Sequence, residues 1–150
     1  MDERGVIKNP ERCRQLIEFR HMLFGDIAPM DVDAMIEYKG MAYLFYEFKL
    51  DGATMPYGQR LALERLADDC TSAGKKAVVF LCEHHEEDAR KIVDAGNAIV
   101  KSVYFGDIAR WRTDIPIKTV SEWTKSFMEY VTKQKGEKQC TNASIAEKKQ

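Results

Sequence analysis

The chain has 150 residues, of which 45% are apolar and 31% charged, the size and composition of one ordinary globular domain. No apolar run approaches the ~18 residues that span a membrane, and the charged N-terminus leads into no apolar segment of a secretory signal. The net charge of −1 excludes a protein that coats nucleic acid by bulk electrostatics, but it leaves room for a local basic rim. We therefore expect no membrane partner and a cytoplasmic protein with free thiols.

The first predicted element is a helix over residues 10–24. Asn9 is a good N-cap, Pro10 suits the first helical position, and Gly25 ends the apolar stripe. Two apolar runs follow, at 32–38 and 41–50. The short polar Lys39-Gly40 link between them predicts a β-hairpin.

The remaining body alternates helix and strand. Amphipathic or apolar runs predict helices over 57–72, 86–95 and 119–133, and strands over 77–82 and 98–105. The order of elements predicts an α/β sandwich in which helices cover a central mixed sheet. We expect one domain over residues 1–133.

The last 17 residues, 134–150, carry four lysines and two glutamates and almost no large apolar side chain. Such a segment buries too little surface to offset the entropy of ordering it. It is predicted to be a disordered, charged tail.

Four polar side chains gather on the predicted hairpin. Asp31 and Asp33 stand two residues apart at the start of the first strand, so their side chains share one face. Glu47 and Lys49 share a face near the end of the second strand. A turn at 39–40 would bring Asp33 beside Glu47 and Lys49.

Two carboxylates and an ammonium group at this spacing suit metal-dependent phosphodiester hydrolysis. Neighbouring carboxylates repel one another unless a hard cation lies between them, and Mg²⁺ is held by one or two carboxylates together with water and phosphate oxygens. The lysine would orient the attacking water or stabilise charge on the phosphate.

Asp33 with Glu47-Phe48-Lys49, followed by Gln59 at the start of a helix, resembles the PD-(D/E)xK nuclease superfamily. The resemblance covers about half of the chain. It implies a restriction-endonuclease-like three-layer sandwich with a mixed sheet of four or five strands. It also implies an endonuclease that cuts DNA with Mg²⁺ or Mn²⁺, in which Asp33, Glu47, Lys49 and Gln59 are catalytic, and it would suit a phage source.

The resemblance does not decide which residues provide two of the metal ligands. Pro29 stands two residues before Asp31, so either Asp31 or Asp33 could be the principal ligand, and we favour Asp33 because an apolar run follows it directly. Members of the family often add an acid from the first helix. Glu18, in the middle of that predicted helix, fits this role better than Glu11, which would favour the helix dipole.

Basic side chains of two predicted helices could form a rim for DNA, with Arg14 and Arg20 on the first and Arg60 on the second. A solvated charged face explains them equally well. A homodimer that cuts both strands is compatible with the resemblance. The alternatives are an inactive protein of nuclease fold, which binds nucleic acid or a protein as a regulator or inhibitor, and an unrelated α/β domain.

Overall fold

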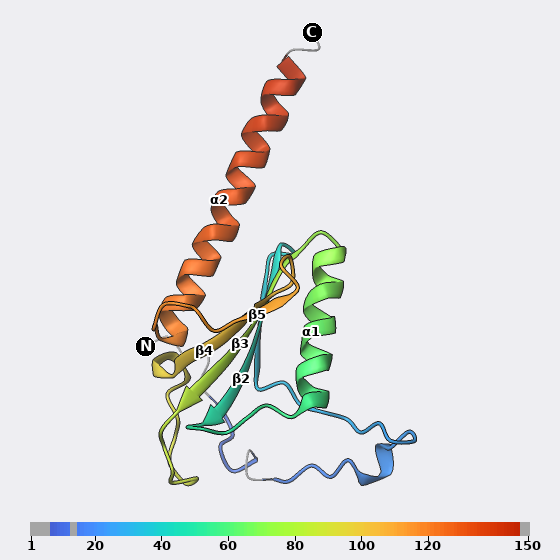
Figure 1. Cartoon of the computed structure of the whole chain (residues 1–150), viewed down its shortest axis with the longest axis vertical. Coiled ribbons are helices and arrows are strands. Elements are labelled where there is room, and N and C mark those ends of the chain that lie inside the picture. Colours follow the sequence, from blue (N-terminus) through green and yellow to red (C-terminus); the bar gives the residue numbers. More distant parts are fainter. Residues whose placement is uncertain (1–6, 13–14, 148–150) are drawn as a thin grey trace. The chain divides into compact units, whose positions relative to one another are not determined.

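The computed structural model describes residues 7–12 and 15–147, with side chains as far as residue 136. The chain divides into two compact units, residues 1–31 and 32–150, where the sequence suggested a single body over 1–133. The second unit holds the sheet and both long helices (Figure 1). Its elements are β1 (Ala34–Tyr38), β2 (Ala42–Leu50), α1 (Tyr57–Ser72), β3 (Lys76–His84), the 3-10 turn η3 (Ala95–Asn97), β4 (Ile99–Phe105), β5 (Arg110–Arg112) and α2 (Val120–Glu147).

The five strands form one sheet in the order β1-β2-β3-β4-β5. β2 and β3 run parallel, and each of the other neighbouring pairs is antiparallel. Helix α1 makes the crossover that a parallel pair requires. The predicted mixed sheet of four or five strands is therefore confirmed.

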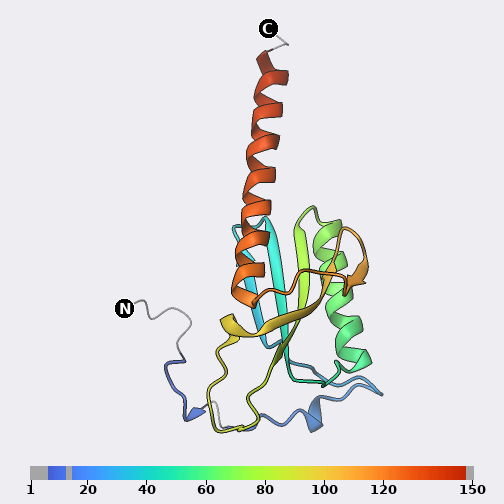
Figure 2. The ribbon, with the colours of Figure 1, turned by 60° about the vertical axis from the view of Figure 1, so that its left-hand side comes forward.

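The two helices lie on opposite faces of this sheet, as Figure 1 and Figure 2 show. Phe45 and Val79 pack with Leu63 of α1 on one face, and Leu44 and Phe80 share the other face with Phe127 of α2. Apolar side chains thus point from β2 and β3 to both sides, which is typical of a central strand. The second unit is a three-layer α/β sandwich.

The hairpin that carries the polar residues forms as predicted. Lys39 and Gly40 have positive φ angles of 51° and 65°, and the amide of Met41 donates to the carbonyl oxygen of Tyr38 at 2.8 Å. Two positive φ angles match the right-handed twist of the flanking strands, as in a type I′ turn. This turn fixes the register of β1 against β2.

The predicted helix over residues 10–24 is wrong for the described part of that segment. It is irregular apart from a 3-10 turn at Arg20–Met22. Leu16 is 96% exposed and Phe24 is 83% exposed, so these two side chains of the apolar stripe are not buried in a core. A helix of this length without such packing is marginal in water.

The predicted helix over residues 86–95 is also wrong. The carboxylates of Asp88 and Asp94 accept hydrogen bonds from backbone amides two residues further on, those of Arg90 and Gly96. Aspartates that bond nearby amides in this way favour turns over helices. The side chain of Ile92 is 95% exposed, so packing does not favour the helix either.

At the other end of the chain, α2 continues through Glu147, beyond the predicted end at Lys133. The helix therefore includes most of the segment that we expected to be disordered. None of the helices formed by the described residues has the length and apolar content needed to cross a bilayer. Cys82 is buried and Cys70 half-buried, and both are free thiols, as expected.

Gly106, in the turn between β4 and β5, allows a close approach to α1. A Cβ atom at this position would lie 2.7 Å from the carbonyl oxygen of Ala67. We expect Gly106→Ala to lower the free energy of unfolding by about 1–3 kcal/mol because the turn or the helix must shift. Chemical denaturation measures the loss. Gly58→Ala is the matched control, since a Cβ there meets nothing within 4 Å; equal effects of the two substitutions would contradict the packing argument.

Candidate active site

The β-hairpin brings Asp33 to the end of β2. Ala34 pairs with Tyr46, so Asp33, one residue earlier, stands opposite Glu47. The Oδ2 atom of Asp33 accepts a hydrogen bond of 2.7 Å from the backbone amide of Phe48. The predicted proximity of Asp33 to the Glu47-Phe48-Lys49 segment is confirmed.

Glu47 is a buried acid in a central strand. It is 1% exposed, and its Oε1 atom lies 2.6 Å from the Nζ atom of Lys49. Both side chains point to the α1 face because they are two residues apart on β2. The second carboxylate oxygen, Oε2, is buried and finds no hydrogen-bond partner among the residues that the structure describes. A buried acceptor in this state is costly unless something else satisfies it.

Helix α1 supplies the fourth member of the cluster. Pro56 is its N-cap residue, and Gln59 lies in its first turn, over the end of β2. The Nζ atom of Lys49 donates to Oε1 of Gln59 at 3.4 Å. Lys49 therefore lies between a carboxylate and a carboxamide, and its side chain is 22% exposed.

Burial raises the pKa of Glu47 above its usual value. The hydrogen bond from Lys49 opposes this, whereas the charge of Asp33 raises the pKa further, and the net result is a higher pKa. Burial disfavours the charged carboxylate, and a second negative charge nearby adds to the penalty. A cation at this position would relieve both effects.

These residues fit a hard divalent cation. Asp33 and the unpartnered oxygen of Glu47 are oxygen donors of the kind that Mg²⁺ prefers. The described side chains contain no group of three or more His, Cys, Asp or Glu arranged around a common metal position. Two carboxylates with water and phosphate oxygens are the expected ligand set for Mg²⁺ in phosphoryl chemistry.

Three other predicted site residues do not belong to the unit that carries this cluster. Glu18, Arg20 and Asp31 belong to the unit 1–31. The carboxylate of Glu18, on irregular chain, pairs at 2.5 Å with Arg20 of the 3-10 turn. Arg14 lies outside the described residues. Arg60 follows Gln59 on α1, and its guanidinium donates to Glu64 at 2.9 Å.

Glu83 is a neighbour of the cluster that the sequence analysis missed. It stands in register with Lys49 in the parallel β2–β3 pair. Its carboxylate accepts from the amide of Gly52 at 3.2 Å and lies 3.4 Å from Nζ of Lys101. The signal was the position of Glu83 at the end of a strand next to the Glu47 strand, but the strand order was needed to use it.

Comparison of the chain with protein-family models, with curated proteins and with solved structures finds no match. The site therefore rests on its own chemistry.

Proposed function

We propose that the chain is a Mg²⁺-dependent nuclease of the PD-(D/E)xK type that hydrolyses phosphodiester bonds in DNA, on a restriction-endonuclease-like version of the α/β sandwich. One observation carries the proposal. Glu47 is buried in a central strand with an unpartnered carboxylate oxygen, and it lies beside Asp33 and in contact with Lys49. A buried acid is costly in a structural role, so its place in this cluster favours a functional one.

Each side chain then has a task. Asp33 and Glu47 would hold the cation, and the hydrogen bond from the Phe48 amide fixes the carboxylate of Asp33. When bound, a divalent cation polarises the phosphodiester and lowers the pKa of a water molecule. Lys49 would orient the attacking water or stabilise negative charge on the phosphate, and Gln59 holds its ammonium group in place.

We also propose that the substrate is chosen by shape more than by base sequence. Arg60, beside Gln59 at the start of α1, would contribute to a basic rim. To contact a phosphate, the guanidinium of Arg60 would have to turn away from its ion pair with Glu64. A homodimer would allow both strands to be cut.

An inactive nuclease-fold protein that binds nucleic acid or a protein partner is the second candidate. The 2.6 Å contact between Lys49 and Glu47 favours it, because the pair neutralises itself without a cation. The unpartnered oxygen of Glu47 argues against it.

A cleavage assay distinguishes the two candidates. Duplex, single-stranded and branched DNA, together with RNA, are incubated with the protein in Mg²⁺, in Mn²⁺ and in excess chelator. We expect cleavage of DNA that needs the cation and that Asp33→Asn abolishes. Asp88→Asn is the matched control, because Asp88 is a surface aspartate paired with Arg90 in a loop.

Cleavage that persists in Asp33→Asn would contradict the assignment of this site. No cleavage of any substrate by the folded protein, with binding of DNA retained, would favour the inactive candidate. Cleavage of RNA alone would still support the proposed metal site, but it would replace DNA by RNA as the proposed substrate.

A further inference from the structure

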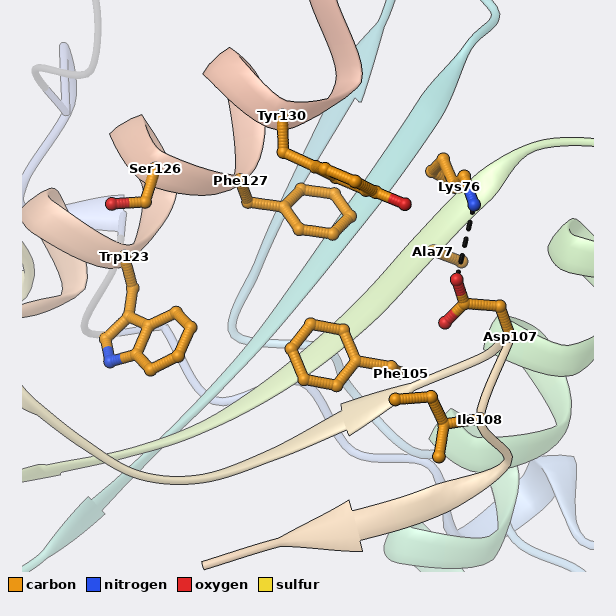
Figure 3. A pocket seen from close by; sticks show the side chains of 9 residues that line it. All are labelled: Lys76, Ala77, Phe105, Asp107, Ile108, Trp123, Ser126, Phe127 and Tyr130. Atoms are coloured by element: carbon orange, nitrogen blue, oxygen red, sulfur yellow. Dashed lines mark hydrogen bonds and ion pairs between the residues drawn. The ribbon is translucent and has the colours of Figure 1, made fainter. Parts of the chain in front are cut away.

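A cavity of about 300 Å³ opens between α2 and the sheet, away from the acid–lysine cluster (Figure 3). Lys76 at its edge pairs with Ala42, whereas Glu47 pairs with Leu81, five residues further along β3. Five residues of strand span about 16 Å. The cavity also lies on the α2 face, opposite the face that carries Glu47. It is therefore a separate place in the fold.

The walls of the cavity are aromatic. The ring centroids of Phe105 on β4 and Phe127 on α2 lie 6.5 Å apart, and those of Phe127 and Tyr130 lie 6.1 Å apart. Trp123 lines the far end of the cavity. Flat rings that line a small cavity favour a flat ligand, because every nucleobase or similar ring has a face that can stack. The volume is at the small end of the range for ligand pockets.

One end of the cavity is polar. The Nζ atom of Lys76 lies 3.2 Å from Oδ2 of Asp107 and 5.6 Å from the ring centroid of Tyr130. In Figure 3 the tyrosine hydroxyl, the lysine ammonium and the aspartate carboxylate gather at this end. Contacts with Tyr130 and Asp107 raise the pKa of Lys76, so it remains a donor at neutral pH.

The position of Asp107 is fixed by its neighbours in the turn. Gly106 contacts α1 closely, and its amide donates to the carbonyl oxygen of Ala77 at 3.0 Å. The side chain of Asp107 is 44% exposed and that of Lys76 is 34% exposed, so both keep access to a ligand. The donor and the acceptor are thus held side by side at the mouth.

We propose that this cavity binds a guanine base. Guanine presents, in a row along one edge, the acceptor O6 and the donors N1–H and N2–H. The ammonium of Lys76 would donate to O6, and the two oxygens of Asp107 would accept from N1–H and N2–H, while the base stacks among the rings of α2 and β4. The other bases lack two adjacent donors beside an acceptor. Each could accept from Lys76 and donate to one oxygen of Asp107, but each would leave the second oxygen of Asp107 without a donor. A free guanine nucleotide and an unpaired guanine in single-stranded nucleic acid offer the same chemistry.

Tryptophan fluorescence tests this directly, because Trp123 lines the cavity. The full chain is titrated with GMP, AMP, CMP and UMP, and with a single-stranded thymidine oligonucleotide that contains one guanine or none. We expect GMP to change the emission and the other nucleotides to bind at least about tenfold more weakly, since each loses hydrogen bonds to a charged group. Trp123→Phe should remove the signal and leave binding detectable by calorimetry.

Asp107→Asn should weaken GMP about tenfold or more, because the amide offers a donor where N1–H or N2–H needs an acceptor. Asp88→Asn, again a surface aspartate paired with a basic side chain, should leave GMP binding unchanged. Binding of the guanine oligonucleotide but not of GMP, with the same loss in Asp107→Asn, also supports the proposal and identifies nucleic acid as the source.

Equal binding of all four nucleotides, equal effects of the two aspartate substitutions, or no binding of GMP or of the guanine oligonucleotide would overturn the proposal. None of these measurements depends on cleavage, so they leave the proposed nuclease activity to its own test.

Discussion

Replacing Lys49 by methionine is expected to lower the rate of DNA cleavage by about 100- to 1,000-fold, the usual effect of losing one group that stabilises developing charge. The Nζ atom of Lys49 lies within 3.4 Å of both Glu47 and Gln59, so its charge has a fixed position beside the carboxylates. Methionine keeps the length of the side chain and removes the charge. Single-turnover cleavage under saturating Mg²⁺ measures the effect.

Lys91→Met is the matched control for this experiment. Lys91 is a surface lysine whose ammonium lies 3.7 Å from Glu86, so it keeps the same type of ion pair outside the cluster. We expect its rate to equal that of the unmodified protein. A Lys49→Met protein that folds and cleaves at the full rate would show that Lys49 has no part in the chemistry.

Replacing Glu47 by glutamine is expected to abolish cleavage and to stabilise the fold. The raised pKa means that folding disfavours the charged form of this side chain relative to the unfolded chain, and glutamine removes that penalty. We expect the free energy of unfolding to rise by about 0.5–2 kcal/mol, as is typical when a functional residue that destabilises the fold is replaced. For a chain of this size, each 1 kcal/mol corresponds to roughly 2–4 °C in Tm. Thermal unfolding in the presence of chelator measures the difference.

The pH dependence follows from the direction of the shift. Between the ordinary glutamate pKa and the raised pKa, the folded protein binds a proton that the unfolded chain has lost. The stability of the unmodified protein therefore falls as pH rises through this range. Glu47→Gln has no such titration. The difference in free energy of unfolding between Glu47→Gln and the unmodified protein should therefore grow with pH and level off above the raised pKa. An advantage that shrinks with rising pH would contradict the assignment.

Mg²⁺ should act in the opposite direction. It needs the charged carboxylate, so it should raise the Tm of the unmodified protein, by an amount that increases with pH, and leave Glu47→Gln unchanged. Glu122→Gln is the control, because Glu122 is an exposed acid that bonds Thr119 at the start of α2. A Tm rise of equal size in Glu47→Gln would place the cation elsewhere.

Local patterns were sufficient to predict the part of the fold that carries the site. Alternation and a Lys39-Gly40 turn predict the hairpin, and a two-residue spacing puts Glu47 and Lys49 on one face. Their proximity to Asp33 follows from the register alone. The helix α1 was predicted with the bounds Tyr57–Ser72 that the structure has.

The failures have a common physical reason. A helix needs a surface to pack on, and Leu16 and Ile92, which lie within the two segments predicted as helices, are almost fully exposed. Apolar residues do recur at helical spacing in these segments, but this spacing does not show whether another element covers them. The short strand β5 escaped prediction because three residues, Arg110–Arg112, carry too little pattern, although Trp111 packs on Tyr104.

The cavity beside α2 could not be predicted for a different reason. Lys76, Asp107 and Tyr130 come from three elements that lie far apart in the chain, and they meet through packing. No spacing of residues along the chain predicts that these three side chains lie together.

The hairpin and the start of α1 hold Asp33, Glu47, Lys49 and Gln59 within the single segment 33–59. The chemistry of the site therefore depends on short loop closures, whose entropic cost is small. During synthesis, this segment can leave the ribosome complete before β4, β5 and α2 exist. Evolution could exchange or extend the C-terminal half of the molecule, including the aromatic cavity, without moving one acid relative to the other.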